Sequence, residues 1–84
     1  MNLTLTEAEM AELFKQAAST AGDGGYQSLL VGLQKKITRA TGQIILTAGD
    51  LEKIPRYAFD YGNGGWEARL IAIFGAHLGP KLGR

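Results

Sequence analysis

Gly62-Asn63-Gly64-Gly65-Trp66 decides the fold, because the chain contains a second version of this stretch 40 residues earlier. The earlier version reads Gly22-Asp23-Gly24-Gly25-Tyr26. Each stretch joins a glycine turn to an aromatic residue, and apolar residues at helical spacing follow both. A unit of about 40 residues that occurs twice indicates an internal repeat, in which neither copy can bury its apolar face alone.

The match continues on both sides of the glycine turns. Downstream, at the same offset of 40, Leu30 faces Leu70. Upstream, at an offset of 41, Thr6 faces Thr47, and an acidic residue stands three positions after each threonine. This spacing is typical of a capping box, in which side chain and backbone satisfy each other at a helix start. The two halves therefore share helix starts as well as turns.

The pattern predicts a mainly α fold in one domain of 84 residues, with two tandem helix–turn–helix repeats related by pseudo-twofold symmetry. The repeats cover residues 3–41 and 43–79. Caps and apolar spacing predict helices over residues 7–21, 25–39, 48–61 and 65–78. Two β-prone segments, residues 2–5 and 43–46, could pair into a short ribbon that joins the repeats.

Particular residues set further expectations within these elements. Pro55 should divide the third helix into pieces over residues 48–53 and 55–61, because proline removes a backbone donor and clashes with the preceding turn. Gly22 and Gly62 should supply left-handed helix caps. The fourth helix is apolar nearly all round and should be the most buried. Residues 81–84 should form a frayed basic tail.

The composition limits which functional classes and compartments the sequence can fit. The net charge of +1 favours neither a nucleic-acid binder nor an acidic nucleic-acid mimic. The absence of cysteine removes disulfides, thiolate nucleophiles and cysteine-based metal sites, and it fits a reducing compartment. The N-terminus lacks the pattern of a signal peptide, and no apolar run is long enough to span a membrane. We therefore expect a cytoplasmic protein.

The glycine turns and their aromatic residues each have two interpretations. Successive backbone N–H groups at a helix start can hold an anion, but glycine more often serves a turn with positive φ or a close backbone approach, which we favour. Tyr26 and Trp66 occupy equivalent places just inside a helix start. Burial in the core is the favoured role, and a contact hot spot is the alternative.

The strongest candidate for a binding surface is the segment 54–61, which holds three aromatic residues within five positions. One helix turn cannot bury all three on one face. If Ile54, Ala58 and Tyr61 point inward, Tyr57 should lie towards the same side. The remaining polar and aromatic residues of the segment, Arg56, Phe59 and Asp60, should then fall nearer to solvent. The predicted partner-binding residues are Arg56, Tyr57, Phe59, Asp60 and Tyr61. The alternative is that these side chains pack against the other repeat or a second copy of the chain.

Catalytic and metal-binding patterns are missing. His77 is the only histidine, it has no ligand-type neighbours at suitable spacing, and it aligns with Ile37, so we expect a packing role. No acid lies in an obviously apolar pocket that would raise its pKa. We therefore expect no enzyme activity, no cofactor and no metal. Lys35, Lys36 and Arg39 form one small basic patch, for which a solvated face at a helix C-terminus is the favoured interpretation. The alternative function is nucleic-acid binding by this patch together with Arg69 or the C-terminal tail.

Residues 47–79, with Ile54-Pro55-Arg56-Tyr57-Ala58-Phe59-Asp60-Tyr61 leading into the second glycine turn, resemble small proteins carried by bacterial phages and mobile elements. Short cysteine-free chains of that origin include inhibitors of host defence such as anti-CRISPR proteins. The resemblance covers the second repeat and implies a binding protein that occupies a partner's surface. A nucleic-acid-binding protein and a self-associating structural protein, for instance a homodimer, remain the alternatives.

Overall fold

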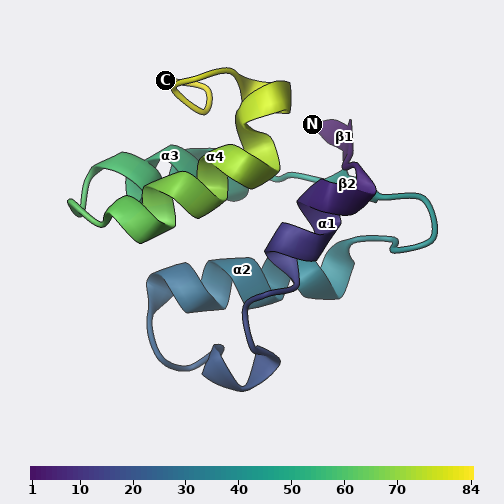
Figure 1. Cartoon of the computed structure of the whole chain (residues 1–84), viewed down its shortest axis with the longest axis horizontal. Coiled ribbons are helices and arrows are strands. Elements are labelled where there is room, and N and C mark those ends of the chain that lie inside the picture. Colours follow the sequence, from purple (N-terminus) through teal and green to yellow (C-terminus); the bar gives the residue numbers. More distant parts are fainter.

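A computed structural model describes residues 1–84 and is mainly helical, with one small antiparallel sheet (Figure 1). Its elements are β1 (Asn2–Thr4), α1 (Glu7–Leu13), the short 3-10 helix η1 (Ala18–Thr20), α2 (Gly25–Lys36), β2 (Gln43–Ile45), α3 (Ala48–Phe59) and α4 (Gly64–Leu78). The mainly helical prediction and the predicted ribbon are both confirmed. No helix combines the length and the apolar character needed to cross a membrane.

Both predicted capping boxes are present. The hydroxyl oxygen of Thr6 accepts from the N–H of Glu9 at 3.1 Å, and that of Thr47 accepts from the N–H of Asp50 at 3.1 Å. The two carboxylates accept in return from the threonine N–H groups at 2.8 and 2.9 Å. Caps of this kind stabilise a helix by about 1 kcal/mol each. They fix the starts of α1 and α3 where the sequence predicts them.

The first helix is shorter than expected, because α1 ends at Leu13 rather than near residue 21. The side-chain amide of Gln34, on α2, donates to the carbonyl oxygens of Leu13 and Gln16 at 2.9 and 2.8 Å. A helix end needs such partners for its free carbonyl groups. Since α1 has already ended, Gly22 is not its cap and lacks a positive φ, whereas Gly62 has φ 64 as predicted.

The third helix runs without a break through Pro55, which contradicts the predicted division into two pieces. Ile54 and Pro55 are both buried. Burial of apolar surface at about 25 cal/mol per Å² offsets the lost backbone hydrogen bond. The second helix, by contrast, ends at Lys36 rather than at residue 39, because Ile37 turns to extended backbone and the next residue bridges to β2.

The ribbon pairs Asn2 with Ile45, Leu3 with Ile44 and Thr4 with Gln43 in antiparallel register. A further backbone bond joins the N–H of Leu5 to the carbonyl oxygen of Gly42 at 2.9 Å. Gly42 has φ 80, and a Cβ atom there would lie 3.2 Å from the Leu5 carbonyl carbon and closer still to its oxygen. Only glycine fits this approach of the two backbones.

The core is shared by the ribbon and all four helices, as expected for a chain of this size. Its fully buried members are Leu13, Leu30, Val31, Leu33, Ile44, Leu46, Ile54, Leu70, Ile73, Phe74 and Leu82. The prediction that the fourth helix is the most buried is wrong, because α2 buries five residues and α4 only three. Helix α4 packs along α3 and α1 on one side, and its other side, including Ile71, faces solvent.

The C-terminal residues are docked on the fold rather than frayed. Leu82 is 1% exposed, and the Arg84 guanidinium makes a two-pronged pair with the Asp60 carboxylate, with one bond of 2.6 Å. A bidentate arginine–carboxylate pair is geometrically specific. The tail therefore ties the end of the chain to the end of α3.

Candidate functional site

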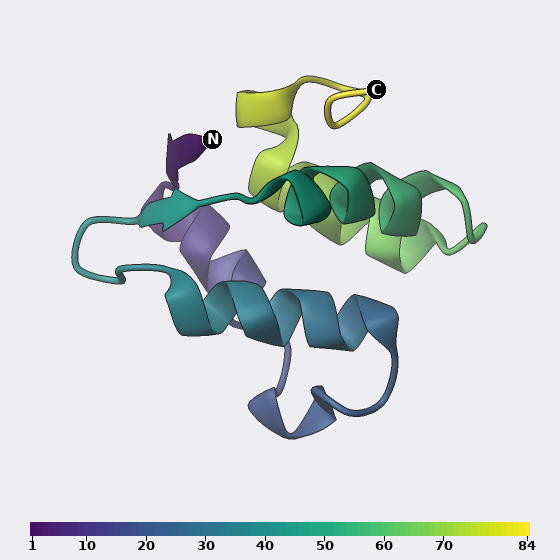
Figure 2. The same ribbon diagram turned by 180° about the vertical axis from the view of Figure 1, so that it is seen from behind.

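Four aromatic side chains meet at one end of the molecule and form what we call the aromatic corner: Tyr26, Tyr57, Tyr61 and Trp66. They come from the first turn of α2, the last turns of α3, the turn after α3 and the first turn of α4. These segments lie at the same end of the molecule in both views, at the left in Figure 1 and at the right in Figure 2. The two glycine turns thus place their aromatic residues side by side.

The rings touch one another in favourable geometries. Tyr26 stacks on Trp66 with centroids 4.5 Å apart, and Tyr57 stacks on Tyr61 at 5.2 Å. The indole meets Tyr57 and Tyr61 edge-on at 6.0 and 5.8 Å. Each such pair contributes about 0.5–1.5 kcal/mol beyond its buried area. The four rings therefore form one contiguous cluster, in which each ring packs on at least one other.

Exposure increases steadily across the corner. Tyr26 is 2% exposed, Tyr57 and Trp66 are half-buried, and Tyr61 is 54% exposed. Burial raises the pKa of Tyr26, and the nearby Arg69 guanidinium acts in the opposite direction. The prediction that Tyr61 points inward is wrong, because α3 ends at Phe59 and Tyr61 no longer follows its inward face. The aromatic chain consequently leads from the core to solvent.

Gly25 leaves room for the Tyr57 ring of the aromatic corner. A Cβ atom at Gly25 would lie 2.7 Å from the Cζ atom of Tyr57 and closer still to its hydroxyl oxygen. The Tyr57 ring therefore rests directly on the start of α2. This contact supports the structural interpretation of the first glycine turn, namely close approach of a side chain to the backbone. In the second turn, Asn63 caps α4 by accepting from the N–H groups of Gly65 and Trp66 at 3.1 Å.

Charged side chains line the face of α3 beside the corner. Glu52, Arg56 and Asp60 follow one another at a spacing of four, so they share one face of the helix. The Arg56 guanidinium lies 5.2 Å from the Tyr57 centroid, over the ring, and its Nε is 3.3 Å from a Glu52 carboxylate oxygen. A hydrogen bond from Arg84 lowers the pKa of Asp60 below its usual value. Both arginines are thus held by carboxylates.

The structure brings together some of the predicted binding residues and separates others. Arg56, Tyr57 and Tyr61 lie together at the corner, whereas Phe59 packs against the core and Asp60 binds Arg84. Sequence reasoning missed that Tyr26 and Trp66 belong to the same cluster. The sequence signal for this contact was that Tyr26 and Trp66 occupy equivalent positions in the two glycine turns. If the two turns lie side by side, residues at equivalent positions can contact each other.

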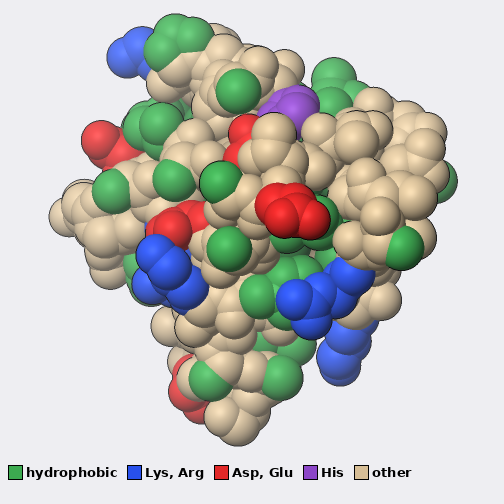
Figure 3. All heavy atoms as spheres, turned by 45° about the vertical axis from the view of Figure 1, so that its right-hand side comes forward, with side chains coloured by type: hydrophobic (Ala, Val, Ile, Leu, Met, Phe, Trp, Pro, Cys, Tyr) green, Lys and Arg blue, Asp and Glu red, His purple; other side chains and the backbone are tan.

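The basic residues considered for nucleic acid are dispersed and largely engaged. Lys36 binds Asp50, Arg69 lies 3.0 Å from Gln16 and 3.8 Å from Glu12, and Arg39 stacks 4.0 Å over the Phe14 ring. Lys35 is exposed and makes no ion pair. Figure 3 shows the blue basic groups of one face as separate groups with red acidic groups among them. No continuous basic stripe is visible on that face.

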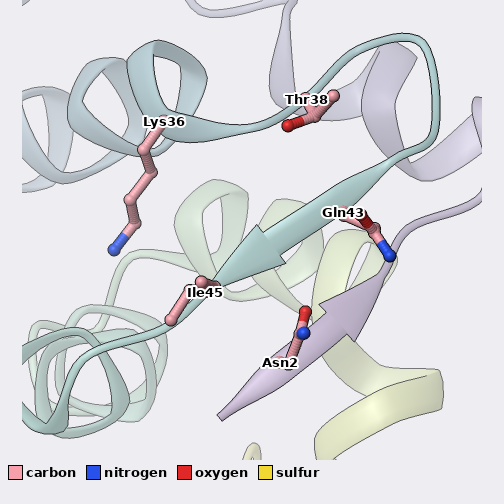
Figure 4. A pocket seen from close by; sticks show the side chains of 5 residues that line it. All are labelled: Asn2, Lys36, Thr38, Gln43 and Ile45. Atoms are coloured by element: carbon pink, nitrogen blue, oxygen red, sulfur yellow. The ribbon is translucent and has the colours of Figure 1, made fainter.

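A shallow pocket of about 250 Å³ lies beside the ribbon. In Figure 4, Lys36 and Thr38 line it on one side of β2, and Asn2 lines it on the other, next to the strand residues Gln43 and Ile45. None of the five lining residues is acidic, and the only cation, Lys36, is already paired with Asp50. The pocket therefore holds no acid–base or nucleophile pair.

The single histidine has an acidic partner that the sequence did not reveal. His77 Nε2 lies 2.8 Å from a Glu9 carboxylate oxygen, which also accepts from the N–H of Thr6. Burial acts to raise the pKa of Glu9, but the bonds from His77 and Thr6 outweigh it, and the pKa lies below its usual value. His77 is half-buried rather than a core residue like Ile37. The pair joins α1 to α4, and no cluster of three metal-binding side chains exists.

Comparisons with protein-family models, with curated proteins and with solved structures find no match to this chain.

Proposed function

We propose that this protein is a non-enzymatic binding module that holds a protein partner at the aromatic corner and the adjoining face of α3. The observation that carries the proposal is the graded exposure of the corner, in which rings anchored in the core end in a tyrosine that is 54% exposed. Tyrosine, tryptophan and arginine are the residues that most often dominate binding energy at protein interfaces.

The packing of the corner suits it to binding. Each exposed ring is held by another ring, and Tyr57 is fixed between Tyr61, Trp66 and the backbone of Gly25. A surface that is already ordered loses little conformational entropy when a partner docks. The alternatives receive less support, because three of the four predicted nucleic-acid residues already have partners within the chain. The Glu9 carboxylate beside His77 caps a helix, which is a structural task.

We further propose that the chain consists of two tandem copies of one unit and that it acts in the bacterial cytoplasm. Strand, α-helix and α-helix follow in the same order in each half, and the first half also contains η1. The starts of β1 and β2 are separated by 43 − 2 = 41 residues, as are the two capping threonines, 47 − 6 = 41. These equal offsets support two tandem copies with pseudo-twofold symmetry. The resemblance of residues 47–79 to phage and mobile-element proteins supports a cytoplasmic inhibitor that occupies the surface of a bacterial defence complex, as anti-CRISPR proteins do.

The test is a capture experiment from bacterial lysate, carried out with and without nuclease. The wild type is compared with the double variant Arg56→Ala, Tyr61→Ala and with a matched control, Lys35→Ala, Ile45→Ala, which also removes one cation and one exposed apolar side chain. We expect a defined protein that the wild type and the control retain and the corner variant loses. Recovery of nucleic acid alone, lost after nuclease treatment, would instead support the nucleic-acid function. Equal retention by both variants would contradict the proposal.

A further inference from the structure

The charges around the aromatic corner differ from those of the chain as a whole. Four of the eight acidic residues pair with lysine or arginine, and a fifth, Glu9, bonds to His77. The three acids without such a partner are Glu7, Asp23 and Glu67. Two of these three lie at the corner. Asp23 stands two residues before Gly25, on which Tyr57 rests, and Glu67 directly follows Trp66. Both are exposed.

A local count shows the imbalance. Residues 22–26 and 62–67, which form the two glycine turns and carry Tyr26 and Trp66, contain two acids, Asp23 and Glu67, and no base. These two segments therefore carry a charge of −2, although the whole chain carries +1. Each local arginine is already held by a carboxylate, so Asp23 and Glu67 keep their negative charge unbalanced. A negative surface attracts a positive partner.

The rings themselves favour the same kind of partner. The face of an aromatic ring is electron-rich and attracts a cation placed within about 6 Å of its centre. The corner already holds one guanidinium in this way, since Arg56 lies 5.2 Å over Tyr57. Tyr61 is more exposed than any other ring of the corner, stacking on Tyr57 and meeting Trp66 edge-on. It therefore offers aromatic surface to a second cation.

We propose that the aromatic corner binds an arginine-bearing segment of a partner protein, with a guanidinium on the exposed Tyr61 surface and with Glu67 and Asp23 supplying the opposing charge. This inference rests on the proposed function and specifies the chemistry of the partner. Arginine fits better than lysine, because the planar guanidinium stacks on aromatic rings and binds carboxylates in a fixed geometry. An exposed cation–aromatic contact and an exposed ion pair are each weak, so several must act together.

Trp66 provides the measurement, because it is the only tryptophan of the chain and its indole touches three of the corner tyrosines. The probe is a synthetic peptide with two arginines separated by glycine, and the control peptide carries neutral citrulline in place of each arginine. We expect the arginine peptide to change the Trp66 fluorescence in a saturable way and the citrulline peptide to leave it unchanged. Equal responses to both peptides, or no saturable response, would overturn the inference.

Variants locate the site. Glu67→Gln and Asp23→Asn together should weaken binding of the arginine peptide by about 5-fold or more, since about 1 kcal/mol corresponds to that ratio. The matched control Glu7→Gln removes the third unpaired acid, which lies at the start of α1 near the ribbon, and it should bind like the wild type. Tyr61→Ala should abolish the response while its circular dichroism stays native. Weakening by Glu7→Gln equal to that of the double variant would refute the site.

The outcomes for the two proposals are separable. If a captured protein depends on Tyr61 but not on Glu67 and Asp23, and the arginine peptide does not bind, the corner remains the binding surface and the inference about arginine fails. If the arginine peptide binds in the predicted way but no captured protein depends on Tyr61, the inference about the chemistry stands and the proposed function fails.

Discussion

Replacing Gly25 by alanine tests whether the aromatic corner depends on the first glycine turn. The new Cβ would lie 2.7 Å from the Tyr57 Cζ atom, so the ring would have to move. The ring is held by two aromatic neighbours, Tyr61 at 5.2 Å and Trp66 at 6.0 Å. Loss of both pairs removes about 1–3 kcal/mol, at about 0.5–1.5 kcal/mol each.

The helix preference of alanine over glycine must be subtracted from this loss of stability. Alanine favours a helix over glycine by about 0.5–1 kcal/mol. The net loss for Gly25→Ala is then about 0–2.5 kcal/mol, and a loss of about 1 kcal/mol in a domain of this size lowers the melting temperature by roughly 4–8 °C. Thermal unfolding followed by circular dichroism measures this shift, and Trp66 fluorescence reports the rearrangement of the corner.

The control is Gly32→Ala in the same helix, where an added Cβ meets nothing within 4 Å. This variant should raise the melting temperature, because only the helix preference acts there. A second test places Gly25→Ala in a Tyr57→Ala background, where the clash is gone and the substitution should become stabilising. The reasoning is refuted if Gly25→Ala stabilises the wild type as much as Gly32→Ala does.

Three further predictions concern contacts between distant parts of the chain. The pKa of Glu9 is depressed in the folded state, so its contribution is present above its ordinary pKa of 4.5 and is lost as pH falls through the folded value. The difference in unfolding free energy between the wild type and Glu9→Gln should therefore shrink between pH 6 and pH 3, and a difference that does not depend on pH would contradict the role of the His77 pair. Leu82→Ala should cost about 2–5 kcal/mol in urea unfolding, since the side chain is fully buried, whereas a frayed tail would give no change. Gly42→Ala should destabilise the protein by more than about 1 kcal/mol in the same assay, because its positive φ and the Leu5 carbonyl both exclude a Cβ, and a neutral result would show that the ribbon can separate there.

Part of the candidate site could be predicted from the sequence. The segment 54–61 identified Arg56, Tyr57 and Tyr61, because three aromatic residues in five positions cannot share one buried face. Which ring would face solvent could not be predicted, since it depends on where α3 ends. Helical spacing predicts Phe59 nearer to solvent, yet the side chain is half-buried and packs against the core.

The sequence by itself determined the local features of this protein: both capping boxes, the left-handed Gly62 and the starts of the helices. These features depend on residues within about four positions of one another, so their physical causes can be read along the chain. Only the tertiary structure decided the end of α1, the unbroken α3, the buried Leu82 and the meeting of the four rings. Gln34 reaches Leu13 across 21 residues and His77 reaches Glu9 across 68, and contacts of that range exist only once the core has formed.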